Sequence, residues 1–165
     1  GSGSIKGNQN KPCCQRCSVK TEPFRMISID TNVLLRYLLA DDAAQYAKAK
    51  SLIKNKCPVL ITDVVLAETA WTLTGKRYNL DKAAVCVVVR GLISDGAFIF
   101  ESSQVIWSAL CDYEEAKIVI GKELDFADSL IANKSHSVAE DIGSSLSAFY
   151  SFDKAVTQLK NARNL

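Results

Sequence analysis

An acidic residue stands between a predicted strand and a predicted helix early in the chain. Isoleucines alternate with a serine over residues 27–29, which is typical of a short strand, and Asp30 follows directly. Apolar residues then recur at helical spacing over residues 33–38, with Thr31 or Asn32 as the predicted N-cap. Ligands bind at the carboxyl ends of strands in an open parallel sheet, so Asp30 is a candidate metal ligand or nucleophile. Its alternative interpretation is a helix cap or a turn residue.

The rest of the chain continues this alternation of strand and helix patterns. Further strands are predicted at 57–61, 97–100 and 146–152, and helices at 43–53, 64–73, 83–93, 105–120, 124–139 and 155–159. Strands that alternate with helices are typical of an α/β fold with a mainly parallel sheet.

The first 25 residues differ in composition from the remainder. They begin with Gly-Ser-Gly-Ser, which is typical of a cloning scar, and Met26 is the only methionine in the chain. We therefore expect a disordered leader over 1–25 and a single domain over 26–165, with Met26 as its natural start. The leader holds five of the 20 basic residues and one of the 18 acidic ones, so the domain has 15 basic and 17 acidic residues. A domain with this balance has no global positive field that would attract nucleic acid.

The cysteines and the apolar runs bear on the cellular compartment. Cys14-x-x-Cys17 has the spacing of half a zinc site, but no second pair with metal-ligand spacing follows. Cys86 and Cys111 are expected to be free thiols, and the three domain cysteines, which include Cys57, indicate a reducing cytoplasm because the chain shows no signal-peptide core. No apolar run approaches the roughly 18 residues of a membrane span, so no membrane association is expected.

Four carboxylates occupy positions where a surface role does not explain them. Asp30 and Asp153 each end a predicted strand, while Glu68 and Asp128 interrupt apolar helical runs and are expected on inward faces. If the four converge at one edge of the sheet, a hard divalent cation such as Mg²⁺ or Mn²⁺ would relieve their repulsion. Asp125 lies three residues before Asp128 and is either a fifth ligand or an N-cap.

A simpler interpretation of these acids remains open. It consists of helix capping, surface exposure, and a buried salt bridge for Glu68. The domain has one histidine, His136, in a polar run, which argues against a histidine-rich zinc site and predicts a solvated side chain.

The four acidic segments resemble the motifs of a known family. Residues 29–34 (Ile-Asp-Thr-Asn-Val-Leu) resemble the opening motif of PIN-domain ribonucleases, specifically the VapC-type toxins of toxin–antitoxin pairs. Residues 65–69, 125–132 and 151–153 are similar to the second, third and fourth motifs of that family, in the same order. The resemblance covers nearly all of the chain from Met26 onward. It implies a three-layer PIN-like fold, in which helices flank a central, mainly parallel sheet.

The resemblance also implies an activity, a site and partners. The expected activity is Mg²⁺- or Mn²⁺-dependent hydrolysis of RNA phosphodiester bonds, with a homodimeric enzyme and a small antitoxin protein as its partner. The implied catalytic metal ligands are Asp30, Glu68, Asp128 and Asp153, and the implied supporting groups are Thr31, Asn32, Asp125 and Ser151. Cations that would contact the RNA backbone are Arg36, Lys76, Arg77 and Lys154, each of which has a solvated surface charge as its alternative.

Two other function classes fit part of the pattern. A phosphohydrolase of the haloacid dehalogenase type would use Asp30 as a nucleophile, but it would need a second aspartate where this chain has Asn32. A binding module without catalytic activity would carry the acids for structural reasons alone.

Overall fold

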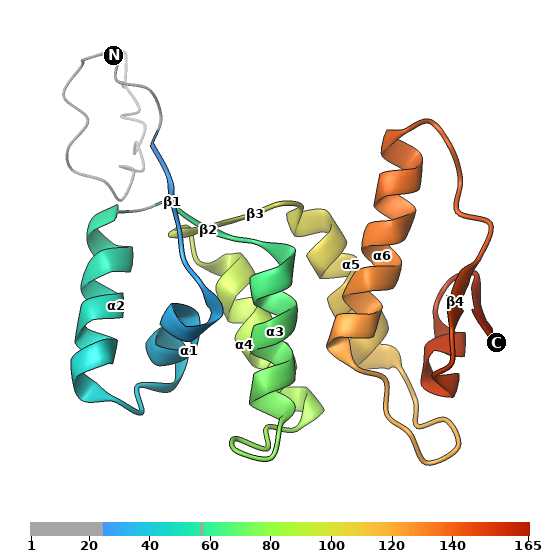
Figure 1. The fold of residues 1–165 in the computed structure, drawn as a ribbon, viewed down its shortest axis with the longest axis horizontal. Helices are drawn as coiled ribbons and strands as arrows, with labels where there is room; N and C mark the ends of the chain where they lie inside the picture. Colours follow the sequence, from blue (N-terminus) through green and yellow to red (C-terminus); the bar gives the residue numbers. More distant parts are fainter. Residues whose placement is uncertain (1–24, 57) are drawn as a thin grey trace, which may run out of the picture.

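The computed structural model describes residues 25–56 and 58–165. Its strands are β1 (Ile27–Ser28), β2 (Val59–Ile61), β3 (Phe98–Phe100), β4 (Phe149–Ser151) and β5 (Ala162–Asn164). Its α-helices are α1 (Thr31–Leu39), α2 (Ala43–Lys56), α3 (Asp63–Thr74), α4 (Lys82–Ser94), α5 (Ser103–Glu115) and α6 (Phe126–Asp141), and the 3₁₀-helix η1 spans Lys154–Gln158. In Figure 1, α2 lies at one end of the molecule, and α6 with the C-terminal segment lies at the other. The predicted α/β class is confirmed.

The first three strands form a parallel sheet in the order β1-β2-β3. Val59 of β2 pairs with Ile27 on one side and with Phe98 on the other. Val59 and Ile61 of this central strand are completely buried, as is usual for a strand covered on both faces. Because the strands are parallel, the residues that follow β1 and β2 lie at the same edge of the sheet.

The last two strands form a second parallel sheet, β4-β5, separate from the first. The sequence predicts one central sheet, whereas the described strands form two. Strand β5 was not expected, because Ala-Arg-Asn over residues 162–164 has neither alternation nor β-branched residues. These elements are compatible with a three-layer arrangement, and the PIN-like fold itself stays a prediction.

Two hydrophobic clusters of different size hold these elements together. The larger one lies around β1, β2 and β3 and includes the fully buried Leu34, Ile61 and Ile106. The smaller one consists of Leu124, Ala132, Ala155, Val156 and Leu159, and it joins α6 to the C-terminal segment. The C-terminal sheet therefore rests on much less buried apolar surface than the first sheet.

Two helix ends differ from the prediction. The N-cap of α1 is Asp30 and not Thr31 or Asn32, because the Asp30 carboxylate accepts the backbone N–H of Val33 at 2.8 Å. Helix α5 ends at Glu115, although the apolar pattern predicts a helix as far as residue 120. The residues after α5 instead form a tight turn, described below.

Several expectations fall at the limits of the described residues. Residues 1–24 of the predicted leader, with the Cys14-x-x-Cys17 pair, lie outside the described residues, and so does Cys57. Cys86 and Cys111 are free thiols, as predicted, and burial raises the pKa of Cys86. Among residues 25–56 and 58–165, we find no helix with the length and apolar character needed to cross a membrane.

Candidate active site

Asp30 follows β1 after one intervening residue and is the N-cap of α1. Its Oδ1 atom accepts the Val33 N–H, so the capping role that the sequence allowed is real. The carboxylate is exposed, and in the part of the chain that the structure describes, its Oδ2 atom accepts no hydrogen bond. One oxygen is thus held by the helix, and the other faces solvent.

Glu68 is connected to this first acid through Thr31. The Thr31 hydroxyl donates a hydrogen bond of 2.6 Å to Glu68 Oε2, which joins the start of α1 to the middle of α3. The expectation that Glu68 points inward is wrong, because its side chain is exposed. Val64 and Trp71, which share its helix face, are also exposed, at 67% and 68%. The apolar run around Glu68 therefore covers two faces of α3, a buried one with Leu66 and Ala70 and an exposed one that Glu68 shares.

Asp125 and Asp128 lie at the start of α6. Asp125 is the N-cap, accepting the Ala127 N–H at 3.1 Å, which confirms one of its two predicted roles. Asp128 is half-buried in the first helical turn, as an inward carboxylate should be. Burial raises the pKa of Asp128, and the nearby charges of Asp125 and Asp153 raise it further. Asp125 and Asp153 are thus both close enough to Asp128 to repel its carboxylate.

Asp153 caps η1 immediately after β4. Its Oδ1 atom accepts the Ala155 N–H at 2.9 Å, and the Ser151 hydroxyl accepts the Asp153 N–H at 3.0 Å. Ser151 thus positions the Asp153 backbone, and its predicted supporting role in the site stays a prediction. The other oxygen, Oδ2, forms an ion pair of 2.6 Å with Lys122. This contact lowers the pKa of Asp153 and raises the pKa of Lys122.

Sequence reasoning missed Lys122 altogether. It is an exposed lysine in a polar stretch after a predicted helix, and a single sequence contains no sign of its pairing with an acid 31 residues later. Only the fold places this lysine against one of the four candidate acids.

The first pair of acids and the second group are joined by the packing of α3 on α6. Glu68 and Ile131 line one cavity of about 380 Å³ between these helices. Ile131 follows Asp128 by three residues, so the two lie on neighbouring turns of the same helix face. Lys134 of α6 reinforces this packing through ion pairs with Asp63 at 2.7 Å and Glu101 at 2.9 Å.

The four predicted acids therefore form two groups. Asp30 and Glu68 are linked through Thr31, whereas Asp128 and Asp153 lie with Asp125 and Lys122. Within residues 25–56 and 58–165, no three His, Cys, Asp or Glu side chains are close enough to hold a metal ion as they stand.

No protein-family model, no curated protein and no solved structure matches this chain.

The chemistry of the carboxylates suits a hard divalent cation. Their oxygens are the ligands that Mg²⁺ and Mn²⁺ prefer. Burial is the main cause that raises the pKa of Asp128, the charges of Asp125 and Asp153 add to it, and Lys122 acts against it, so a cation beside Asp128 would favour its ionised form. In kind and in charge, these residues fit such a cation, although the side chains do not form a ready cage.

The remaining predicted site residues have other surroundings. Asn32 is exposed and lines a cavity of about 280 Å³ with Asp30 and Arg36. Arg36 is engaged by Asp41 at 2.7 Å and by Gln45, so it mainly braces the turn between α1 and α2. Lys154 is exposed beside Asp153. Of the predicted RNA-contacting cations, Lys154 is thus the one adjacent to a candidate acid in sequence.

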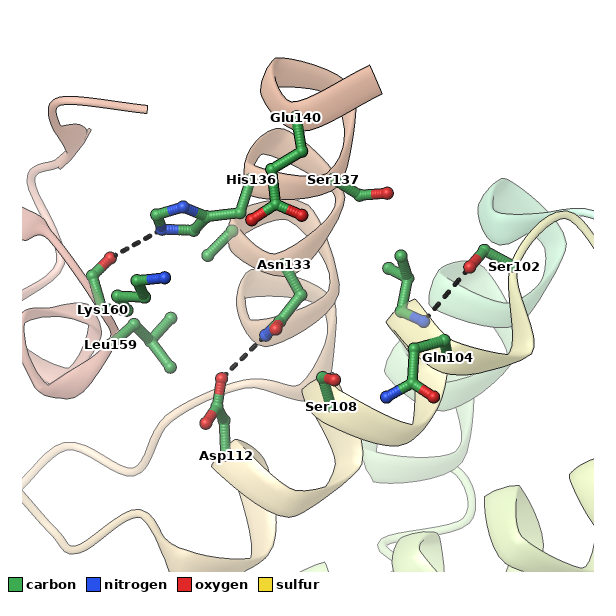
Figure 2. A pocket seen from close by; sticks show the side chains of 12 residues that line it. Ser102, Gln104, Ser108, Asp112, Asn133, His136, Ser137, Glu140, Leu159 and Lys160 are labelled. Carbon is green, nitrogen blue, oxygen red and sulfur yellow. Dashed lines mark hydrogen bonds between the residues drawn. The ribbon is translucent and has the colours of Figure 1, made fainter. Parts of the chain in front are cut away.

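A separate polar pocket lies between α5 and α6, as Figure 2 shows. Its volume is about 340 Å³, and Asn133 and Asp112 face each other across it with a hydrogen bond of 2.8 Å. His136 is half-buried here, and its Nε2 atom lies 3.1 Å from the Lys160 carbonyl oxygen in an exposed contact, so the histidine is partly solvated. None of the four candidate acids lines this pocket.

Proposed function

We propose that this protein is a Mg²⁺- or Mn²⁺-dependent endoribonuclease of the PIN-domain, VapC-like type. Its reaction is the hydrolysis of RNA phosphodiester bonds. The observation that supports this proposal best is that the four motif acids form two groups, Asp30 with Glu68 and Asp128 with Asp153, on elements that the packing of α3 on α6 joins. Each acid is held by a specific contact or by burial, and none of them is a freely mobile surface side chain.

Each residue contributes a definable part of this chemistry. A divalent cation supplies positive charge for the phosphate and lowers the pKa of a bound water molecule. Asp30 and Asp128 offer carboxylate oxygens from the first turns of α1 and α6. The Thr31 hydroxyl donates a hydrogen bond to the Glu68 carboxylate, which in this proposal orients water or completes the ligand set. Ser151 and the η1 cap hold Asp153 in a defined orientation.

The proposed partners follow from the surface next to Glu68. Val64 and Trp71 of α3 and Ile131 of α6 expose apolar side chains beside the cavity that Glu68 lines, with Ile131 at 51% exposure. Such a patch beside an acidic site suits a protein partner. We propose a small antitoxin as that partner and a homodimer as the assembled form.

The direct test is Asp30→Asn in the presence of Mg²⁺. Asparagine keeps the cap on Val33, so the fold is retained while one negative charge is lost. We expect a loss of at least about 100-fold in the cleavage of single-stranded RNA. Asp42→Asn is the matched control, because Asp42 also caps a helix by accepting the Gln45 N–H and is not one of the motif acids. Full ribonuclease activity in Asp30→Asn would disprove the proposal.

A further inference from the structure

A tight turn between α5 and α6 places a lysine against a candidate catalytic acid. Val119 and Lys122 exchange two backbone hydrogen bonds, of 2.9 and 3.0 Å, around Ile120 and Gly121. Both central residues have positive φ, of 50° and 73°, which defines a type I′ turn. A β-branched residue such as Ile120 strongly disfavours this conformation, so the surrounding contacts must impose it.

Those contacts fasten the turn to the C-terminal segment. Gln158 of η1 accepts the Lys117 N–H at 2.7 Å and donates to the Lys117 carbonyl oxygen at 2.8 Å. At the other end of the turn, the Lys122 ammonium contacts Asp153 Oδ2 at 2.6 Å. Leu124, two residues later, is buried in the smaller hydrophobic cluster. The backbone on both sides of Lys122 is therefore anchored, and the lysine is directed at Asp153 by the fold.

The position of this ammonium group is informative because of its neighbours. Asp125 and Asp153 both lie within electrostatic range of Asp128, and Lys122 forms an ion pair with Asp153. The Lys122 ammonium group thus contacts Asp153 Oδ2, whereas Asp153 Oδ1 accepts the N–H that caps η1. The same group of carboxylates does not form a cage for a metal ion in this arrangement.

We propose that Lys122 is a built-in cation that holds Asp153 in a resting state, and that a divalent cation competes with Lys122 for this carboxylate. This role of Lys122 rests on the proposed function, which supplies the reason for a metal ion to bind here. Since the lysine side chain is 65% exposed, its ammonium group can move into solvent while the turn stays in place. In the resting state Lys122 neutralises the charge of Asp153, and in the metal-bound state Lys122 no longer contacts Asp153.

Calorimetric titration of the full chain with Mn²⁺ tests the competition without any measurement of activity. Lys122→Met removes the charge and keeps most of the side-chain length. We expect Mn²⁺ to bind this variant about tenfold more tightly than the wild type, because a contacting positive charge is gone. Lys117→Met is the matched control, since it removes one positive charge from the same turn without touching an acid. Its affinity should stay within about twofold of the wild type, because exposed charges at a distance are largely screened.

A second pair of variants connects the effect to Asp153. In an Asp153→Asn background, Lys122→Met should change the Mn²⁺ affinity little, because the competing contact has already been lost. Equal affinities of wild type and Lys122→Met, or weaker binding by Lys122→Met, would overturn the proposal while leaving the ribonuclease proposal intact. Absence of Mn²⁺ binding in the wild type and in every variant would overturn both.

Discussion

The two groups of candidate acids differ in the partners of their carboxylates and in the hydrophobic cluster on which their elements pack. Asp30 and Glu68 are exposed, and neutral donors hold them: a backbone N–H and the Thr31 hydroxyl. Asp128 is half-buried among other acids, and its neighbour Asp153 depends on a lysine. The first group belongs to helices on the larger core, whereas Asp153 and Lys122 border the small cluster under the C-terminal sheet. We therefore expect the acids of the first group to be held more rigidly than those of the second group, whose arrangement would change when a cation binds.

The largest expected effect concerns whether the two groups act as one site. Asp30→Asn and Asp128→Asn should each reduce the kcat/KM of RNA cleavage by about 100- to 1000-fold. The double variant should be little worse than either single variant, because residues that act as a unit show strongly non-additive losses. Kinetics on a fluorogenic RNA measures all three. Losses that multiply in the double variant would show that the two groups work independently.

The next effect compares the two hydrophobic clusters. Leu34→Ala, in the larger core, should lower the free energy of unfolding by about 3 kcal/mol, since Leu34 is completely buried. Leu159→Ala, in the small cluster, should cost about 2 kcal/mol, because Leu159 is buried beside a pocket into which the site can relax. Denaturant unfolding measures both values.

Amide hydrogen exchange distinguishes the two hydrophobic clusters in a second way. We expect Leu159→Ala to accelerate amide exchange mainly over residues 149–164, while exchange in β2 stays slow. Equal acceleration in β2 would mean that the molecule opens as a single cooperative unit and that the proposed difference in support does not exist.

A smaller effect isolates the link within the first group. Thr31→Val keeps the shape of the side chain and removes the hydrogen bond to Glu68, so we expect a loss of about tenfold in kcat. The free energy of unfolding should change by less than about 1 kcal/mol, because both groups can bind water instead. Thr31→Ser, which retains the hydroxyl, is the control and should keep nearly full activity. Unchanged kcat in Thr31→Val would mean that Glu68 needs no positioning by Thr31.

The sequence predicted the elements better than it predicted their surroundings. Apolar periodicity located every α-helix, because buried faces impose that spacing locally. It misjudged Glu68, since a run of apolar residues does not reveal whether the face they share is covered. It also could not show that Lys122 reaches Asp153, because that contact depends on how distant segments pack. Three of the candidate acids cap helices, so a cap and a ligand give the same local sequence signal.

The smallest effect is a pH-dependent stability change that separates Asp128 from its neighbours. Burial and adjacent acids raise the pKa of Asp128 in the folded state, so its contribution to stability falls as the pH rises from the unfolded-state pKa through that raised pKa, and above it the ionised side chain opposes folding. Without metal, Asp128→Asn should therefore unfold at a higher temperature than the wild type at pH 7. The difference should vanish below the unfolded-state pKa of about 3.9, where both side chains are neutral.

Added Mn²⁺ should reverse the order at pH 7, because the wild type alone keeps the full set of carboxylates. Thermal unfolding across pH, with and without Mn²⁺, checks each step. A variant less stable than the wild type at pH 7 without metal would show that Asp128 is already compensated within the fold.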